Sequence, residues 1–221
     1  MDMPDKKDGR PAAADLQDII LERICFLQYQ PGDQLREADL AAEFGTSRTP
    51  VRDALSRISH LGLIESRNGV GTVVITLSDR QIAQVYEMRL QLAPLIGTVS
   101  PTEVQDTHIE RADALLDEAR QLAERFDEKR YVVINHRLNQ LITDLIGNAV
   151  LQSFWRQTYY QAASTWYQVA EKVGPEVARS LVDELDDLCT ALRHGDLAAV
   201  GHIQRVHIGY GYARIKTHLF Q

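Results

Sequence analysis

The segment 35–75 constrains the fold more than any other part of the chain, and its centre is a tight turn between two short helices. The first helix ends at Gly45, a residue type that favours such turns. The second helix begins at once, with Thr46 or Ser47 as its N-cap. Pro50 then falls in the first turn, where a missing backbone N–H is tolerated. This arrangement predicts a helix-turn-helix.

The second helix has two chemically different faces. At about 100° per residue, its apolar side chains form one inward stripe, which comprises Val51, Ala54, Leu55, Ile58 and Leu61. The opposite face carries cations and small hydroxyls, at Arg48, Thr49, Arg52 and Ser56. A helix of this kind can lie in the major groove of DNA. Arg57 lies about 130° from Arg52 on the helical wheel, so we expect it to point away from the bases.

A β-hairpin is predicted directly after this helix. Residues 63–67 and 72–75 have the composition of short strands, and Asn68-Gly69 between them is typical of a hairpin turn. A further helix is predicted over residues 12–28. The whole segment is therefore expected to form a winged helix-turn-helix of three helices and a small hairpin, with Arg67, Asn68 and Gly69 at the tip of the wing.

Beyond residue 77 the strand pattern disappears and helical periodicity continues. Residues 78–81 and 100–103 each form a capping box, and these are expected to open helices that end near residues 97 and 126. Turn-forming pairs separate four more predicted helices, over about 128–146, 149–172, 176–193 and 197–219. We therefore predict a mainly α protein: a disordered tail over 1–11, a winged helix-turn-helix domain over 12–76, and an all-helical bundle of six helices over 77–221.

The composition excludes several classes of protein. The net charge of −7 argues against a protein that coats nucleic acid without selectivity, whereas four arginines and only two acids lie between residues 47 and 71. Cys25 and Cys189 lie far apart in helical patterns, so we expect two buried thiols in a reducing compartment. Because no apolar run approaches the roughly 20 residues of a membrane span and no signal segment is visible, we expect a cytoplasmic protein without a membrane partner.

Several motifs closely resemble the head of GntR-type bacterial transcription regulators: Leu35-Arg36-Glu37, Leu40-Ala41, the run from Ser47 to Leu55, and Gly62-Leu63-Ile64. The region past residue 77 looks like the FCD effector domain of the FadR subgroup. The resemblance implies a homodimer that binds a short palindromic DNA operator under the control of a small metabolite. It also implies DNA contacts, and together with the wing these are Arg36, Ser47, Arg48, Thr49, Arg52, Arg67, Asn68 and Gly69. The alternative for Arg48 and Arg52 is that they are ordinary solvated surface arginines.

Many FCD domains hold a divalent metal through an Asp, a His four residues later, and two more histidines. With Gly147-Asn148 as the reference, the first two positions are Asn135 and Asn139 here, the third is Leu185, and only His207 remains. Amide oxygens are weak ligands for a transition metal, so we expect no metal and no cofactor. His136 lies nearby, but its place on the helical wheel predicts an exposed side chain. A metal-dependent regulator with an atypical site is the alternative.

Arg89 falls within the apolar stripe of the first helix of the bundle, and a buried guanidinium needs an anion. Related domains commonly carry a Glu four residues later, where this chain has Ala93. Arg89 is therefore free to hold an effector carboxylate or phosphate, the alternative being a structural salt bridge or a side chain that reaches solvent. The other expected effector contacts are Asn135, Asn139, His207, Tyr210 and Arg214. For His207 alone, a hydrogen-bonded core histidine is more common than a ligand contact.

The leading interpretation is a ligand-responsive transcription regulator that is not an enzyme. A helical-bundle enzyme fused to a DNA-binding head is the second possibility, and it would need a nucleophile–base pair, paired carboxylates or a metal cluster. None of these appears at a suitable spacing in the sequence. The aromatic-rich helix at 149–172 is expected to serve the core or a dimer surface.

Overall fold

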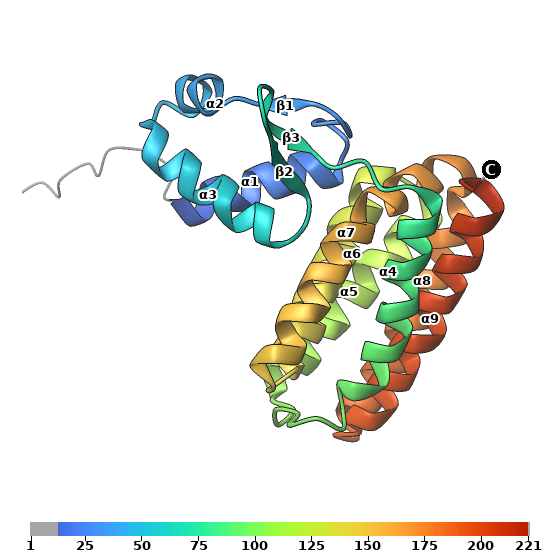
Figure 1. Ribbon diagram of the computed structural model, residues 1–221. Coiled ribbons are helices and arrows are strands. Elements are labelled where there is room, and N and C mark those ends of the chain that lie inside the picture. The colour runs from blue at the N-terminus through green and yellow to red at the C-terminus, as the bar shows by residue number, and fades with distance from the viewer. Residues whose placement is uncertain (1–12, 221) are drawn as a thin grey trace, which may run out of the picture. The chain divides into compact units, whose positions relative to one another are not determined.

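The computed structural model describes residues 13–220, with side chains from residue 16, and the predicted tail over 1–11 lies outside this range. The chain divides into two compact units between Thr76 and Leu77 (Figure 1). Over the described residues the protein is mainly α-helical, with nine α-helices and a small antiparallel sheet, which confirms the predicted fold class.

The first unit is a winged helix-turn-helix. Its elements are α1 (Ala13–Cys25), β1 (Gln34–Leu35), α2 (Glu37–Glu43), α3 (Arg48–His60), β2 (Ile64–Arg67) and β3 (Gly71–Val74). Gly45 has a φ of 61°, the left-handed conformation that the turn between α2 and α3 requires. Ser47 is the N-cap of α3, and Pro50 lies in the first turn. Four of the five residues of the predicted apolar stripe are buried, and Leu61 at the end of the helix is half-buried.

The sheet has the strand order β1-β3-β2, and both pairs are antiparallel. The predicted hairpin is present, with Arg67 paired to Gly71 across the turn. Strand β1 was not predicted, because two residues are too short to show an alternating pattern. It pairs Leu35 with Thr72, which attaches the segment before α2 to the wing.

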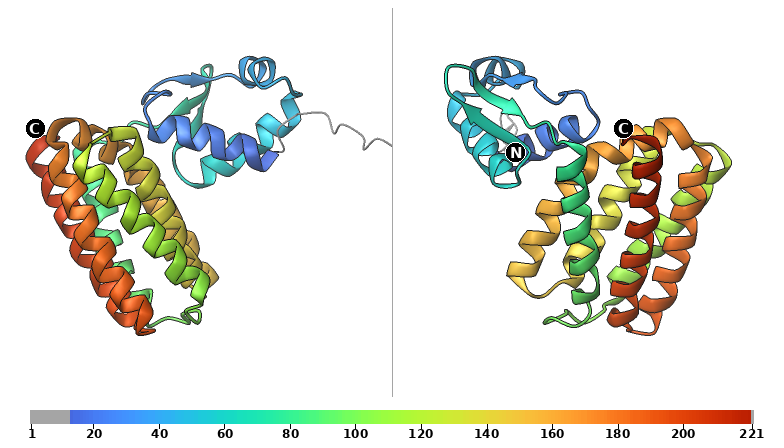
Figure 2. Two further views of the ribbon diagram at one scale, coloured as in Figure 1. Left: turned by 180° about the vertical axis from the view of Figure 1, so that it is seen from behind. Right: turned by 45° about the vertical axis from the view of Figure 1, so that its right-hand side comes forward.

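The second unit is a bundle of six α-helices (Figure 2). Its elements are α4 (Asp79–Leu92), the 3₁₀ turn η1 (Ala93–Leu95), α5 (Asp106–Glu124), α6 (Glu128–Leu145), α7 (Ala149–Val173), α8 (Pro175–Arg193) and α9 (Leu197–His218). Packing contacts join α4 to α7, α7 to α6, α6 to α5, α5 to α8, α8 to α9, and α9 to α4. The helices therefore form a closed ring around a common centre.

One predicted helix boundary in this unit is wrong. The capping box at Ser78 is present, since its hydroxyl accepts from the backbone N–H of Gln81. The box expected at Ser100 does not form, and α5 begins at Asp106 instead. Residue Pro101 pairs with Ile146 in an isolated antiparallel bridge, which holds this segment extended. A contact with a residue far away in the sequence thus overrides the local helix signal.

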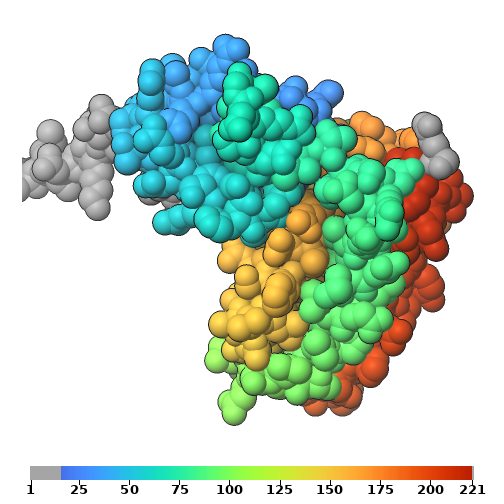
Figure 3. All heavy atoms as spheres, viewed as in Figure 1, coloured from blue at the N-terminus to red at the C-terminus, as the bar shows by residue number. Residues whose placement is uncertain are grey.

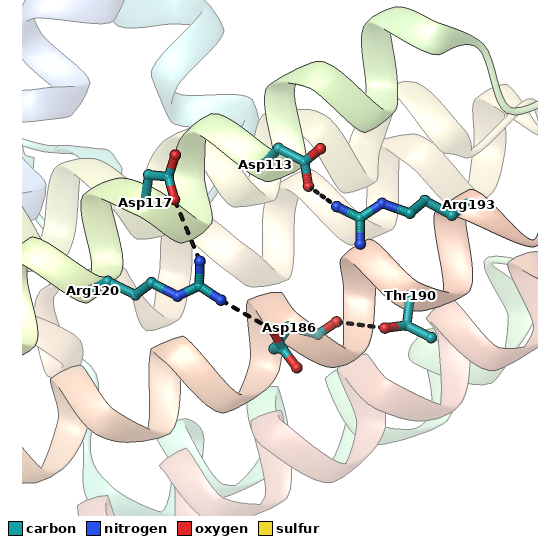
Figure 4. Close-up of polar contacts among 6 residues, drawn as sticks. All are labelled: Asp113, Asp117, Arg120, Asp186, Thr190 and Arg193. Atoms are coloured by element: carbon teal, nitrogen blue, oxygen red, sulfur yellow. Dashed lines mark hydrogen bonds and ion pairs between the residues drawn. The ribbon is translucent and has the colours of Figure 1, made fainter.

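Ion pairs lie along the surface between α5 and α8 (Figure 4). Arg193 of α8 pairs with Asp113 of α5, and Arg120 of α5 lies 3.4 Å from Asp186 of α8. Because the position on α8 decreases as the position on α5 increases, the two helices are antiparallel. Exposed pairs of this kind each contribute about 1 kcal/mol or less, so their main effect is to define the register of two helices that the apolar core holds together.

Candidate DNA-binding face and effector cavity

The eight predicted DNA contacts all have exposed side chains or backbone on the first unit. Ser47, Arg48 and Thr49 lie at the N-terminus of α3, and the Ser47 side chain makes no capping hydrogen bond. Unpaired backbone N–H groups at a helix N-terminus, together with free hydroxyls and a cation, form a suitable site for a phosphate. Arg57 is also exposed, in the last turn of the same helix.

Arg52 is held in a defined orientation by a residue that the sequence analysis did not select. Its Nε and Nη2 atoms donate to the two carboxylate oxygens of Glu37 on α2, at 2.8 Å and 2.7 Å. The same hydrogen bonds lower the pKa of Glu37. Two parallel bonds fix the plane of the guanidinium, so α2 orients the arginine that α3 presents to solvent.

The wing carries its own polar groups. Arg67 forms an ion pair with Glu65 at 2.7 Å, and Asn68 and Gly69 lie exposed at the turn. The Gln34 side chain of β1 donates to the carbonyl of Val70 and accepts from Nε of Arg36. β1 and the wing thus position Arg36, the remaining predicted contact, from the same small sheet.

The second unit contains a cavity of about 50 Å³ among α4, α6, α7, α8 and α9. Five of the six predicted effector residues line it, namely Arg89, Asn135, Asn139, His207 and Arg214. The prediction that Tyr210 faces inward is wrong, since its side chain is 55% exposed and lines an outer groove. A Cβ atom added at Gly211 would lie 2.6 Å from the Trp166 ring, so position 211 faces the interior. Tyr210, about 100° away on the helix, therefore points outward.

Arg89 lies at the centre of this site. Its side chain is buried, and the rings of Trp155, Tyr159, Trp166 and Tyr86 surround the guanidinium carbon at 5.4–5.9 Å. Burial lowers its pKa. Its Nε and Nη1 atoms make no hydrogen bond, and neither do the Nε1 atoms of Trp155 and Trp166. The cavity therefore contains several hydrogen-bond donors without acceptors.

The other predicted effector residues differ in how many of their polar side-chain atoms have a hydrogen-bond partner. Asn135 donates to the carbonyl of Tyr131 in its own helix at 2.9 Å, whereas Oδ1 of Asn139 makes no hydrogen bond. His207 has an unpaired Nδ1, and its Nε2 lies 4.0 Å from Asp187. Burial lowers the pKa of His207. Arg214 is already paired, to Glu176 at 2.9 Å, so it is less available to a ligand than Arg89.

A half-buried acid also lines the cavity, and the sequence analysis did not select it. Glu184 of α8 accepts a hydrogen bond of 2.8 Å from Nε2 of Gln204. Burial raises the pKa of Glu184 to about 7, although the charge of Arg89 and the hydrogen bond act in the opposite direction. Glu184 lies directly before Leu185, on a helix for which the sequence analysis gave only the bounds. A carboxylate next to the buried apolar residues of that helix was the available signal.

The prediction that His136 is exposed is wrong. Its side chain is half-buried, and its Nδ1 lies 2.8 Å from the hydroxyl of Tyr159 on α7. Burial lowers the pKa of His136 to about 4. Among the side chains that the structure describes, no three His, Cys, Asp or Glu residues converge as metal ligands. The absence of a metal remains a prediction.

A winged helix-turn-helix followed by an all-helical unit with an internal cavity defines a two-domain DNA-binding protein of the ligand-sensing kind. Comparison with known families agrees with this class: residues 12–74 match the family of bacterial regulatory proteins called gntR, and residues 84–210 match the FCD domain. The chain belongs to the GntR family of transcription regulators and carries an FCD domain. Within residues 13–220, no helix has the length and apolar character needed to cross a membrane.

The individual proteins that the chain resembles have low sequence identity to it. The chain is 28% identical, over 70% of its length and 69% of the relative, to a protein of Paenarthrobacter nicotinovorans described as a probable D-xylose utilization operon transcriptional repressor. It is 21% identical to the regulator McbR of Escherichia coli, over 78% of both chains. The solved structure of McbR superimposes with a TM-score of 0.79, covering 93% of this chain and 97% of McbR at 18% identity, and at this identity it supports the fold alone.

Proposed function

We propose that this regulator acts as a dimer on a palindromic operator, and that a small anion bound at Arg89 changes its affinity for DNA. The observation that carries the proposal is the buried guanidinium whose Nε and Nη1 have no hydrogen-bond partner. An unpaired buried charge is costly, and a ligand carboxylate would remove that cost. We expect repression of the target gene, as the relative from Paenarthrobacter nicotinovorans is described as a repressor, and a cytoplasmic location with the DNA.

On the DNA side, Arg48 and Arg52 are placed four residues apart on the exposed face of α3. Arginine donates in pairs to guanine O6 and N7 in the major groove. The Glu37 carboxylate would hold Arg52 ready for this contact. Arg36 and the wing residues Arg67, Asn68 and Gly69 are assigned to the backbone and the adjacent groove.

The DNA assignment is tested by mobility-shift titration of the DNA upstream of the gene with Arg52→Ala and Arg57→Ala. Loss of a good base contact costs about 1–3 kcal/mol, so Arg52→Ala should bind about 5- to 150-fold more weakly. Arg57→Ala removes an equally exposed charge from the same helix and should have a much smaller effect. An equal loss of DNA affinity in both variants would show that α3 contributes only charge and that Arg52 contacts no base.

Dimer formation is supported by apolar surface on the second unit. α4 and α7 pack side by side and form one face of the bundle (Figure 3). Met88 of α4 is 50% exposed, and Val150 and Phe154, one turn apart on α7, are 65% and 51% exposed. Large exposed apolar side chains on adjacent helices favour association, and a second copy of the chain is the partner that a palindromic operator requires.

The effector site is proposed to work without a metal. Asn135 and Asn139 offer neutral amide oxygens, Leu185 is fully buried and is no ligand, and His207 is the one imidazole among the four positions that the family uses. The positive charge that a metal would supply to an anion comes from Arg89 instead. Elemental analysis of the purified protein tests this, and stoichiometric zinc, nickel or manganese would contradict it.

A further inference from the structure

The cavity contains two ionisable groups of opposite kind. Arg89 reaches it from α4 and Glu184 from α8, and the charge of Arg89 favours the ionised form of Glu184. The two side chains do not form an ion pair with each other, since Glu184 is bonded to Gln204 and Arg89 has two unpaired nitrogen atoms. Each group is therefore available to a different part of one ligand.

Several polar atoms around the cavity have no partner, and His207 of α9 contributes one of them, its Nδ1. The unpaired donors come from α4 and α7: the Nε and Nη1 of Arg89 and the Nε1 atoms of Trp155 and Trp166. The acceptors come from α8 and α6, as the Glu184 carboxylate and the unpaired Oδ1 of Asn139. Buried polar groups are almost always hydrogen-bonded. A ligand that satisfies this cavity must carry acceptor oxygens for one side and a donor for the other.

We propose that the effector is a short carboxylic acid that also carries a hydroxyl or ammonium group, with its carboxylate on Arg89 and its donor group on Glu184. The inference rests on the proposed anion site and adds a specificity-determining residue, Glu184. A ligand with acceptors alone would leave Oδ1 of Asn139 unpaired and would give the Glu184 carboxylate no partner beyond Gln204. A phosphate or other multivalent anion would in addition lie next to the Glu184 carboxylate, which disfavours it.

The size of the cavity limits the ligand. About 50 Å³ is well below the roughly 150 Å³ of a cavity that holds benzene, so two- or three-carbon acids are the appropriate probes. Ser180, His207 and Arg214 line both this cavity and the outer groove between α8 and α9. A longer acid would therefore extend toward that groove, while its carboxylate and donor group occupy the inner site.

The two tryptophans of the chain, Trp155 and Trp166, both line the cavity, so their fluorescence reports binding directly. Propionate, lactate and alanine are titrated at pH 7 into the full-length protein, because they share a carboxylate and differ at the second carbon. Lactate or alanine should bind roughly 10- to 100-fold more tightly than propionate, since a hydrogen bond to a charged group contributes about this factor. A preference for lactate identifies a hydroxyl ligand, and a preference for alanine identifies an ammonium ligand.

Two variants separate the roles of the residues. Glu184→Gln keeps an acceptor oxygen for Gln204 but presents an amide donor to the ligand, so it should abolish the preference over propionate. Asp186→Asn alters an exposed carboxylate on the same helix that pairs with Arg120, and it should leave the preference unchanged. Equal binding of all three acids by the wild type would overturn the role of Glu184. The same result would still agree with an anion site at Arg89. Binding of none of them would overturn the inference, and an Arg89→Met variant that still responds to other anions would overturn the proposed site as well.

Discussion

At the scale of single residues, Arg89 is costly to bury, and it is the residue to which we assign the effector anion. Burial disfavours its charged form, as its lowered pKa shows, and the surrounding aromatic rings only partly replace water. Replacement of an unpaired buried charge by a well-packed apolar chain is often neutral or stabilising. A group that weakens the free protein in this way is typical of a binding site, and this supports its assignment to ligand rather than to stability.

His136 gives a prediction about pH. Its folded-state pKa is about 4, against 6.5 in the unfolded chain, so the unfolded state binds the proton more strongly in this range. Stability is therefore full above pH 6.5 and is lost as the pH falls toward 4. Between pH 7 and pH 5 the wild type should lose about 2 kcal/mol more unfolding free energy than His136→Gln. Urea titration followed by tryptophan fluorescence measures this, because both tryptophans lie in the second unit.

The comparison with His136→Gln removes the contribution of other groups. The lowered pKa of His207 acts in the same direction, whereas the raised pKa of Glu184 makes acid stabilising, and both are present in wild type and variant. The same pH dependence in the two proteins would mean that His136 is solvated and that its contact with Tyr159 does not bury it.

The sequence predicts some residues better than others for a physical reason. Arg89 was identified because a charge within an apolar helical stripe is visible from spacing alone. His136 lies at the edge of the stripe of α6, and its burial depends on Tyr159 from a different helix. Glu184 and Tyr210 depend likewise on how α8 and α9 are rotated against their neighbours. The spacing of apolar residues shows which face of a helix is buried. The neighbouring helix that packs on this face determines how wide the buried region is.

At the scale of elements, α9 must approach α7 closely at one position. A Cβ atom on Gly211 would lie 2.6 Å from the Trp166 ring, whereas one on Gly209 would meet only Leu90 at 3.9 Å. Gly211→Ala should therefore destabilise the second unit by about 1–3 kcal/mol through overpacking. Gly209→Ala should stabilise it by up to about 1 kcal/mol, because alanine is the better helix former.

Both glycine variants are measured by thermal or urea unfolding of the second unit, and each is the control for the other. A stabilising Gly211→Ala would show that α9 can move away from Trp166 at no cost. The indole of Trp166 also lines the cavity, so Gly211→Ala should in addition change tryptophan emission, and Gly209→Ala should not.

Most elements could be predicted because their boundaries are local. Gly45, the Ser78 capping box and the Gly174-Pro175 pair each begin or end a helix through their own backbone chemistry. Strand β1 and the delayed start of α5 could not be predicted, because β1 exists only through its pairing with β3 and the bridge of Pro101 to Ile146 delays α5.

At the scale of the whole molecule, a short segment of the chain links the DNA-binding unit to the helix that carries the proposed effector site. The first unit ends at Thr76, and α4 begins two residues after Leu77 and carries Arg89 three turns further on. An anion that binds Arg89 would contact α4 and the facing helices α7, α8 and α9 at once. A ligand that binds one arrangement of these helices better than another would shift their populations, and α4 would pass the change to the DNA-binding unit.

The most direct test of this account is operator affinity with and without effector, measured by fluorescence anisotropy on the upstream DNA for wild type and Arg89→Met. The acid that binds most tightly in the tryptophan-fluorescence titration should change the operator Kd of the wild type by about 5- to 150-fold, the usual range of such coupling. Arg89→Met should bind the same DNA with the affinity of the free wild type and show no response to the acid. A response of Arg89→Met equal to that of the wild type would contradict the account.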